Sequence, residues 1–251
     1  MSDIKELNLS KQELIELPDL SGYANLKLLL CMKNKLQNIA NLPPTLESLD
    51  CRCNKLTSLP NLPQSLKILN CCSNNIIHLD NLPSNLTNLY CDGNYIKSLD
   101  NLPPSLQYLY CNNNKITSLD NLPNTIKFLF CNNNKITSLD NLPNSLKFLH
   151  CLSNIITSLD NLPQSIIQLQ CQDNKITHLN NLPQGLEFLE CSLNNITTLE
   201  NLPNKIIFLK CLDTKIETIK NIPDSLEELY HNNENFQEIE NKPNKLKIFN
   251  L

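Results

Sequence analysis

A twenty-residue pattern recurs along this chain and constrains its fold more than any other feature. The segment Asn121 to Asp140, NLPNTIKFLFCNNNKITSLD, has close copies from Asn41 to Glu240. Within these copies, a Cys recurs every twentieth residue from Cys51 to Cys211, and an Asn recurs from Asn54 to Asn194. A fixed period of about 20 to 50 residues is typical of solenoids, in which stacked neighbours bury the apolar surface that one repeat cannot bury alone. We therefore expect an elongated array of repeats.

Each unit reads LxxLxCxxNx(L/I)xx(L/I)xNLPxx and predicts a short strand followed by extended chain. In the copy that begins at Asn41, Leu49 and Cys51 would point inward, and Ser48, Asp50 and Arg52 outward. Strands repeated at one register pair in parallel. The remainder of the unit, such as ITSLDNLPNS, is too rich in Pro, Asn and Asp for a helix. We expect an extended or polyproline-like outer side with few or no helices.

The boundaries of the array follow from where the pattern is regular. Residues 1–251 are expected to form a single right-handed array of about twelve repeats. It would consist of an atypical first repeat at 4–25, regular repeats at 26–225 and degenerate terminal repeats at 226–251. In the degenerate part, His231 replaces the Cys of the pattern and Glu234 replaces the Asn. This decay is typical of the polar terminal repeat of a solenoid.

The unit resembles the leucine-rich repeat, whose core is LxxLxLxxN. Its form LPxxLxxLxCxxNxLxxL is similar to the short repeats of bacterial type III effectors and to leucine-rich proteins of large DNA viruses and amoebae. The resemblance covers the chain from about Leu7 to Leu251. It implies a repeat solenoid, the leucine-rich-repeat horseshoe, with a parallel β-sheet on its concave face. It also implies a protein-binding surface instead of a catalytic centre.

Composition and motifs exclude several classes of function. The net charge is −4, and the Lys residues are spread over the repeats, so we expect no nucleic-acid surface. No apolar run has the length of a signal peptide or a membrane span, which predicts a cytoplasmic protein of the producing cell or of an infected host cell. The four His residues occupy different repeat positions, and no HExxH, GxSxG or phosphate-binding Gly-rich loop occurs. We therefore expect that the protein is not an enzyme and that it binds no cofactor.

Asn, Cys and Asp each recur at one fixed place in the repeat, so each would form a column of stacked side chains along the array. All three columns have structural interpretations. The Asn column would bond the backbone of the turn that follows each strand. The Cys column would pack as small apolar residues, since a straight line of thiols does not converge on a metal and needs no disulfide. Cys72 lies outside that column and is expected to react first. The Asp column from Asp80 to Asp160 predicts turns, and a calcium site is the alternative.

Aromatic residues concentrate at the two outward positions of the predicted strands, which would line the concave face. Two hypotheses account for them: mutual support as a ladder, such as Tyr108-Phe128-Phe148, or a partner-binding surface. We favour partner binding, centred on Tyr90 to Phe148. Nine of the thirteen aromatic residues are the candidate partner-binding residues: Tyr90, Tyr108, Tyr110, Phe128, Phe130, Phe148, Phe188, Phe208 and Tyr230. The charged residues expected at the rim are Asp50, Arg52, Asp92, Glu190 and Lys210.

The favoured function is a non-enzymatic module that binds an unknown protein partner, without nucleic acid, membrane, metal or cofactor. One alternative is a self-assembling structural protein, a possible homodimer through the concave face or a C-terminal edge strand. Another is an exported adhesin or receptor-like binding protein. The sequons at Asn8, Asn85 and Asn195 would be relevant only to that exported alternative.

Overall fold

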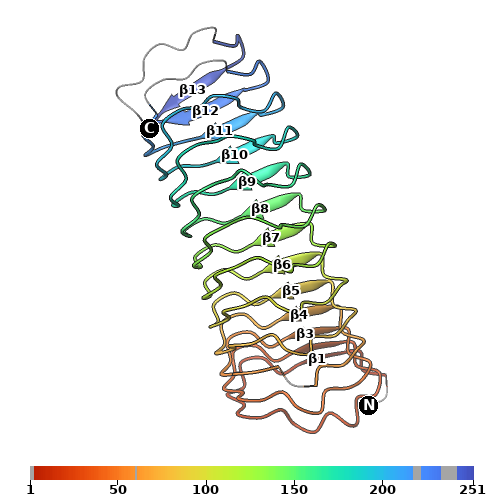
Figure 1. Ribbon diagram of the computed structural model, residues 1–251. Helices are drawn as coiled ribbons and strands as arrows, with labels where there is room; N and C mark the ends of the chain where they lie inside the picture. The colour runs from red at the N-terminus through yellow and green to blue at the C-terminus, as the bar shows by residue number, and fades with distance from the viewer. Residues whose placement is uncertain (1–2, 60, 217–221, 233–241) are drawn as a thin grey trace. The chain divides into compact units, whose positions relative to one another are not determined.

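The computed structural model of the chain consists of short parallel strands joined by extended loops (Figure 1). It describes residues 3–59, 61–216, 222–232 and 242–251. The chain divides into two compact units. The first comprises Met1–Ile116 with Asn121–Ile126, and the second comprises Thr117–Asp120 with Lys127–Leu251. No helix occurs within the described residues, in agreement with the prediction from the Pro-rich half of the repeat.

Six strands form the parallel sheet of the first unit, and each pairs with the next along the chain. They are β1 (Glu6–Asn8), β2 (Leu28–Leu30), β3 (Ser48–Asp50), β4 (Ile68–Asn70), β5 (Asn88–Tyr90) and β6 (Tyr108–Tyr110). The pairing register is twenty residues between regular repeats, as in Leu49 with Leu69. Between β1 and β2 it is twenty-two, as in Leu7 with Leu29. The longer first repeat of the sequence pattern is therefore present.

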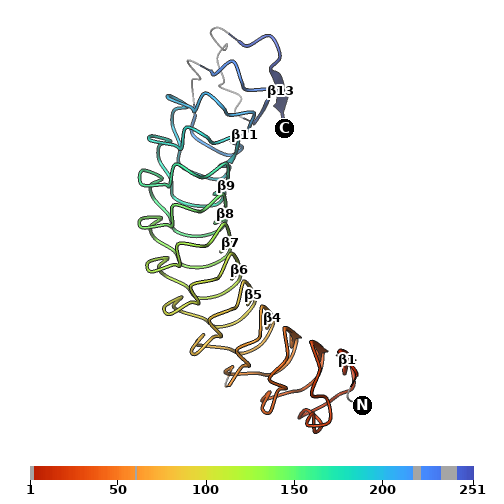
Figure 2. The same cartoon turned by 90° about the vertical axis from the view of Figure 1, so that its right-hand side faces the viewer.

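Seven strands form the parallel sheet of the second unit, again paired in chain order. They are β7 (Phe128–Phe130), β8 (Phe148–His150), β9 (Gln168–Gln170), β10 (Phe188–Glu190), β11 (Phe208–Lys210), β12 (Glu228–His231) and β13 (Lys247–Asn250). In each unit the strands lie along one side and extended loops along the other (Figure 2). Both units are solenoids with parallel strands, as the period predicted. The single continuous array remains a prediction.

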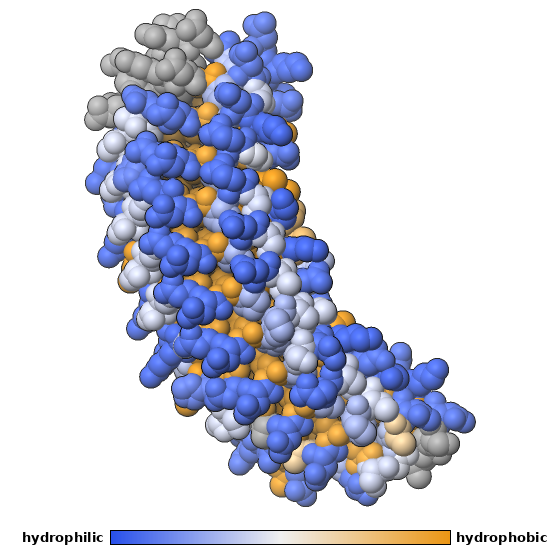
Figure 3. All heavy atoms as spheres, turned by 45° about the vertical axis from the view of Figure 1, so that its right-hand side comes forward, coloured by the Kyte–Doolittle hydropathy of each residue, from blue (hydrophilic) through white to orange (hydrophobic). Residues whose placement is uncertain are grey.

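The core of each repeat consists of the Leu, Ile and Cys residues of the pattern. In β7, Leu129 has no exposed surface, and Cys131 and Ile136 are equally buried. The residues on either side of the central Leu point to the outward face of the strand and are half-buried. On the face shown in Figure 3, apolar residues of the second unit form a narrow band between rows of polar side chains. Burial of these periodic residues stabilises the stack because each repeat covers the apolar surface of its neighbour and removes it from water.

Two columns of residues adopt left-handed backbone conformations, with φ between 52° and 64°. One column lies two residues after the strand Cys and includes Asn113, Asn133 and Leu193, together with Gly93. Many Asn residues preceding Leu-Pro, such as Asn141, form the other. Asn tolerates this region better than most residues because its short polar side chain bonds locally, which explains its abundance in the turns.

The last strand departs from the twenty-residue register. Lys247 still donates its backbone N–H to the carbonyl of Glu227, twenty residues earlier, at 2.9 Å. Tyr230, however, pairs with Phe249, which is nineteen residues away. A slip of one residue moves a side chain to the opposite face of a sheet. Phe249, which aligns in sequence with the inward Leu229, therefore stacks on the outward Tyr230.

Candidate binding surface

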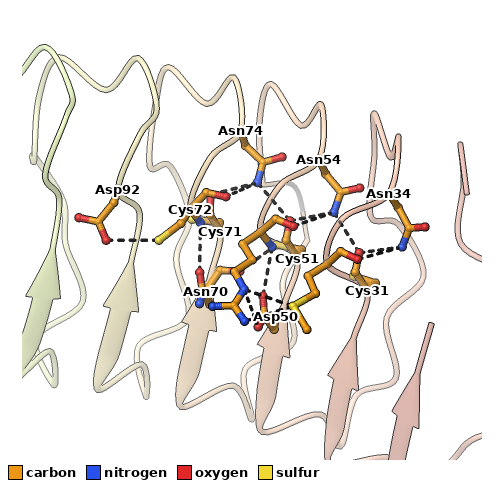
Figure 4. Close-up of polar contacts among 12 residues, drawn as sticks. Cys31, Asn34, Asp50, Cys51, Asn54, Asn70, Cys71, Cys72, Asn74 and Asp92 are labelled. Carbon is orange, nitrogen blue, oxygen red and sulfur yellow. Dashed lines mark hydrogen bonds and ion pairs between the residues drawn. The ribbon is translucent and has the colours of Figure 1, made fainter. Parts of the chain in front are cut away.

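A buried row of Asn side chains fixes the turns behind the outward strand face (Figure 4). Asn54 donates from Nδ2 to the carbonyls of Cys51 at 2.9 Å and Cys31 at 3.0 Å. Its Oδ1 accepts the N–H of Leu36 at 3.0 Å. The same bonds recur at Asn74 and Asn94. Each Asn thus joins its own repeat to the preceding one, so the predicted structural role of the column is confirmed.

The Cys column is a row of buried free thiols. Cys51 donates from Sγ to the carbonyl of Asn70 at 3.4 Å, and that carbonyl also accepts the N–H of Cys51 at 2.8 Å. The thiols of Cys71, Cys91 and Cys131 make the same contact with the next strand at 3.3 to 3.4 Å. Burial raises the pKa of the Cys131 thiol to about 12. The thiols pack and donate weakly, in accordance with the packing interpretation.

Cys72, which lies outside the buried Cys column, has a partner in the next repeat. Its side chain is half-buried and donates from Sγ to Oδ2 of Asp92 at 3.3 Å. Burial, and then the negative charge of Asp92, raise the pKa of the Cys72 thiol to about 12. Because only the thiolate is a good nucleophile, Cys72 is a poor one near neutral pH. This environment argues against the prediction that Cys72 reacts first.

The Asp column forms turns on the outer side of the second unit. Ser138 donates its hydroxyl to Oδ2 of Asp140 at 2.6 Å, and the N–H of Asp140 donates back to that hydroxyl at 3.0 Å. Asn161 of the next repeat donates to Oδ1 of Asp140 at 2.7 Å. These bonds, from Ser138 first and Asn161 next, lower the pKa of Asp140. Each of these Asp side chains therefore accepts hydrogen bonds from its own turn and from the next repeat, as the turn interpretation predicted.

In the first unit, the aromatic residues lie on β5 and β6. The rings of Tyr90 and Tyr110 stack with centroids 4.8 Å apart and planes 25° apart. Tyr108 is half-buried at the other outward position of β6. Burial and the neighbouring Tyr90 raise the pKa of Tyr110, so its hydroxyl stays neutral at physiological pH.

A second group of rings occupies β7 and β8 in the second unit. Phe128 and Phe148 stack at 4.6 Å with planes only 5° apart. Phe130 meets the imidazole of His150 edge-on at 4.5 Å and 67°. His150 Nε2 lies 3.1 Å from the Gln168 amide nitrogen. Burial lowers the pKa of His150, and the negative charge of Glu190 opposes this effect. The predicted stacking of Phe128 on Phe148 is confirmed, while the Tyr108–Phe128 step between the two units remains a prediction.

A third group, which we call the β10–β13 ring row, contains Phe188, Phe208, Tyr230 and Phe249. Phe188 and Phe208 stack at 4.3 Å and 4°, and Tyr230 and Phe249 at 4.4 Å and 10°. The step from Phe208 to Tyr230 is wider, at 5.3 Å, and tilted by 36°. Sequence reasoning missed Phe249, because only the register slip of β13 places it beside Tyr230.

The fold does not require aromatic side chains at these positions. Outward positions of other strands hold Ser48 and Asp50 in β3, and Gln168 and Gln170 in β9. The nine predicted residues are all half-buried, because stacking covers part of each ring. The structure therefore supports a contribution from mutual packing and leaves each ring partly exposed to solvent on the strand face.

The charged residues expected at the rim form pairs within each unit. Arg52 Nε lies 3.4 Å from Oδ2 of Asp50, and its guanidinium also contacts Sδ of Met32 at 3.2 Å. Asp92 accepts the N–H of Asn112 at 2.7 Å. In the second unit, Glu190 and Lys210 form an ion pair at 3.1 Å. Pairing reduces the charge that these residues present to a partner.

Comparisons with known proteins show which class of protein the chain resembles. Residues 84–124 match a family model described as leucine-rich repeats in two copies. A search of the curated proteins found no match. Together with the parallel-stranded solenoid, these findings identify the chain as a leucine-rich-repeat protein, and its repeats resemble those of bacterial leucine-rich effectors. No helix within the described residues is long and apolar enough to span a membrane.

Particular solved structures are similar over nearly the whole chain. YopM from Yersinia enterocolitica is 31% identical with a TM-score of 0.90, covering 99% of this chain and 55% of that protein. YopM from Yersinia pestis, described as a leucine-rich effector, is 27% identical with a TM-score of 0.68, covering 98% and 82%. InlJ from Listeria monocytogenes, whose functional domain includes a cysteine ladder, is 26% identical with a TM-score of 0.73, covering 94% and 60%. The chain thus spans only about half of the Y. enterocolitica protein.

Proposed function

We propose that the chain is a non-enzymatic protein-binding module that acts in the cytoplasm of the producing cell or of an infected host cell. YopM from Y. pestis, a similar leucine-rich-repeat structure, is an effector protein, which supports a non-enzymatic role of this kind. The candidate surface is the outward strand face. Its aromatic residues are of the types enriched in the cores of protein interfaces.

One observation carries this proposal. The aromatic residues gather at outward strand positions that the fold can equally fill with Ser, Asp or Gln. Aromatic side chains bury a large area with little loss of conformational entropy, so they often dominate binding energy. Stacked rings such as Phe128 and Phe148 are also held in place before a partner arrives, and this preorganisation favours affinity.

The experiment replaces Tyr110, Phe128, Phe130 and Phe148 by Ser and compares partner capture from cytosol. A matched control replaces Gln168 and Gln170 by Ser on the same strand face. We expect the aromatic variant to lose a partner that the wild type and the control retain, with circular dichroism unchanged. Equal capture by all three proteins would contradict the proposal.

The oligomeric state of the purified chain is the companion measurement. Light scattering after size exclusion, with reductant and over a tenfold concentration range, reports whether the rings are already covered. We expect a monomer, which leaves the strand face open to a different protein. A stable dimer that the aromatic variant abolishes would instead indicate self-assembly through this face.

A further inference from the structure

Two lysines lie in consecutive repeats beside the stacked rings of β7 and β8. Lys127 and Lys147 directly precede Phe128 and Phe148, and both lysine side chains are exposed. The backbone N–H of Lys147 donates to the carbonyl of Lys127 at 2.9 Å, so the two residues are neighbours across the sheet. Adjacent strands are about 4.8 Å apart, so two like charges are held close together at this position.

No carboxylate of the same strand face neutralises these lysines. Neither lysine forms an ion pair within the part of the chain that the structure describes. The segments 127–130, 147–150 and 167–170, which contain β7, β8 and β9, have no Asp or Glu. Glu187, the next carboxylate at the lysine position of the repeat, is separated from the second lysine by the repeat of Ile167. This part of the strand face is therefore positively charged.

The first unit shows which ligand lysines at this repeat position hold. There Glu47 lies between Lys27 and Lys67 in consecutive repeats, and its carboxylate oxygens are 2.8 Å from the Nζ atom of each lysine. The hydrogen bonds from Lys27 and then Lys67 lower the pKa of Glu47 to about 2, so this carboxylate stays charged at physiological pH. Lysine side chains at this position thus converge on a carboxylate beside the strands.

The stacked rings favour a ligand of the same sign. Phe128 and Phe148 lie 4.6 Å apart with planes 5° apart, so the ring faces that meet are covered and the pair presents ring edges to solvent. Aromatic edges carry positive electrostatic potential, opposite in sign to the faces. The rings and the lysines therefore both attract an anion, while an apolar neighbour of that anion can cover exposed ring carbon.

We propose that the β7–β8 face, which comprises Lys127, Phe128, Phe130, Lys147 and Phe148, binds an acidic segment of a partner protein. An Asp or Glu carboxylate of that segment lies between the two lysines, and an adjacent apolar side chain lies on the ring edges. This proposal rests on the proposed function and specifies the chemistry of the partner. Charge complementarity selects an acidic partner over a basic one.

Fluorescence anisotropy of three labelled hexapeptides tests the charge of the ligand. The peptides alternate Glu-Leu, Gln-Leu or Lys-Leu, at an ionic strength of about 0.15 M, where the Debye length is about 8 Å. The protein has a net charge of −4, so nonspecific attraction would favour the Lys-Leu peptide. We expect saturable binding of the Glu-Leu peptide and at least about fivefold weaker binding of the other two. Equal affinity for the Glu-Leu and Gln-Leu peptides, or tightest binding of the Lys-Leu peptide, would overturn the proposal.

Two matched charge variants locate the site. Lys127→Gln with Lys147→Gln removes the pair, and Lys135→Gln with Lys175→Gln makes the same change of net charge at exposed residues outside the strands of the same unit. We expect the first variant to bind the Glu-Leu peptide about tenfold more weakly and the second less than about twofold more weakly. Equal losses in the two variants would mean long-range attraction and contradict the proposed site.

A charge reversal tests whether the carboxylate lies between the lysines. Lys147→Glu places a carboxylate beside Lys127, as Glu47 lies beside Lys27 in the first unit. We expect this variant to lose its preference for the Glu-Leu over the Gln-Leu peptide. Its urea midpoint should be at least that of the wild type, because an attraction replaces a repulsion. A retained preference for the Glu-Leu peptide in the folded variant would contradict the placement.

The partner-capture experiment separates the possible failures. We expect Lys127→Gln with Lys147→Gln to lose the partner that the aromatic Ser variant loses. If the lysine variant retains that partner, the acidic-segment proposal is wrong and the protein-binding function stands. Equal capture by the wild type and the aromatic variant would contradict the protein-binding function itself. Tighter binding of oligothymidylate than of the Glu-Leu peptide, lost in the lysine variant, would assign the pair to nucleic acid and overturn the proposal.

Discussion

Each buried Asn after a strand bonds the backbone of two neighbouring repeats. Asn94 donates to the carbonyls of Cys71 and Cys91 at 3.1 and 3.0 Å and accepts the N–H of Ile76 at 3.0 Å. Its side chain is only 5% exposed, so water cannot replace these bonds without opening the turn. The column therefore contributes to stability through groups that would otherwise be buried without partners.

We expect Asn94→Ala to lower the free energy of unfolding by roughly 3 kcal/mol, since each buried unsatisfied polar group costs about 1 to 3 kcal/mol. Asn94→Thr should lose less, because Thr214 at the same repeat position donates its hydroxyl to the carbonyl of Cys211 at 3.0 Å. Urea unfolding measures both variants. Equal destabilisation by Ala and Thr would show that the hydrogen bonds are not the cause.

Leu193 has a left-handed backbone, with φ of 56°, and is 52% exposed. Left-handed conformations are unfavourable by about 1 to 2 kcal/mol for residues with a Cβ, but Asn relieves part of this by local hydrogen bonding. We expect Leu193→Asn to raise the free energy of unfolding by up to about 1 kcal/mol. Leu152→Asn, at a residue whose backbone is not left-handed, serves as the control in thermal unfolding. An equal gain in both variants would contradict the backbone explanation.

Thiol reactivity distinguishes the buried Cys row from the two remaining Cys residues. Burial holds the pKa of column thiols such as Cys51 well above its usual range, and that of Cys72 is about 12. In the folded protein near pH 8, we expect Cys53 to be alkylated first and the column thiols last. Mass spectrometry of timed samples identifies the labelled residue, and labelling after denaturation should reach all twelve free thiols. Early labelling of a column thiol would show that the repeats open locally.

At the scale of strands, we expect His150 to make the stability of the second unit sensitive to acid. Burial lowers the pKa of His150 in the folded state, so the unfolded chain binds a proton more readily. The stability that neutral His150 contributes is complete above about pH 6.5, the pKa of His in the unfolded chain. This contribution declines as the pH falls toward the lower pKa of His150 in the folded protein.

We expect the wild type to lose more stability than His150→Gln between about pH 7.5 and about pH 5. Gln is a suitable replacement because Gln170 fills the same outward position in the next strand. The urea midpoint measured at both pH values gives the comparison. The same acid loss in both proteins would assign the effect to other groups, such as the Asp turns.

Strand positions and their inward residues follow from the alternation around Leu and Cys, so sequence reasoning located Leu49, Cys51 and the outward Ser48. The pairing of Phe128 with Phe148 followed from the same period. The register slip that brings Phe249 to Tyr230 did not, because hydrogen-bond register near the end of a sheet depends on backbone geometry that the pattern does not encode. The high pKa of Cys72 was missed because it depends first on the burial of this side chain and then on the position of Asp92 in the next repeat.

At the scale of the whole molecule, many hydrogen bonds join residues about twenty positions apart, such as the bond from the N–H of Glu47 to the carbonyl of Lys27 at 2.9 Å. Removal of residues 141–160 from the second unit would bring equivalent positions into the same register, because Asn161 can then meet Asp120 as Asn141 does at 3.2 Å. Stability of such arrays is approximately a sum over repeats and their neighbours. The period itself therefore sets which deletions are compatible with folding.

We expect deletion of residues 141–160 to retain the circular dichroism spectrum per residue and the protection of the column thiols. Deletion of residues 146–155, half a repeat, should abolish both, because it removes Leu149 and Cys151 and shifts the remaining pattern by ten positions. Spectra and timed alkylation compare the two proteins. Similar folding of both deletions would contradict the dependence on register.

The thiol row also gives the molecule a spectroscopic property. A thiol such as that of Cys91 donates to the carbonyl of Tyr110 in the next strand at 3.3 Å, and hydrogen bonding lowers the stretching frequency of a donor bond. The S–H stretch absorbs in a region of the infrared spectrum where other protein groups and water are nearly transparent. Replacement of one column Cys at a time by Ala would assign its band, so that vibrational spectroscopy could follow the separation of individual repeats without an added label.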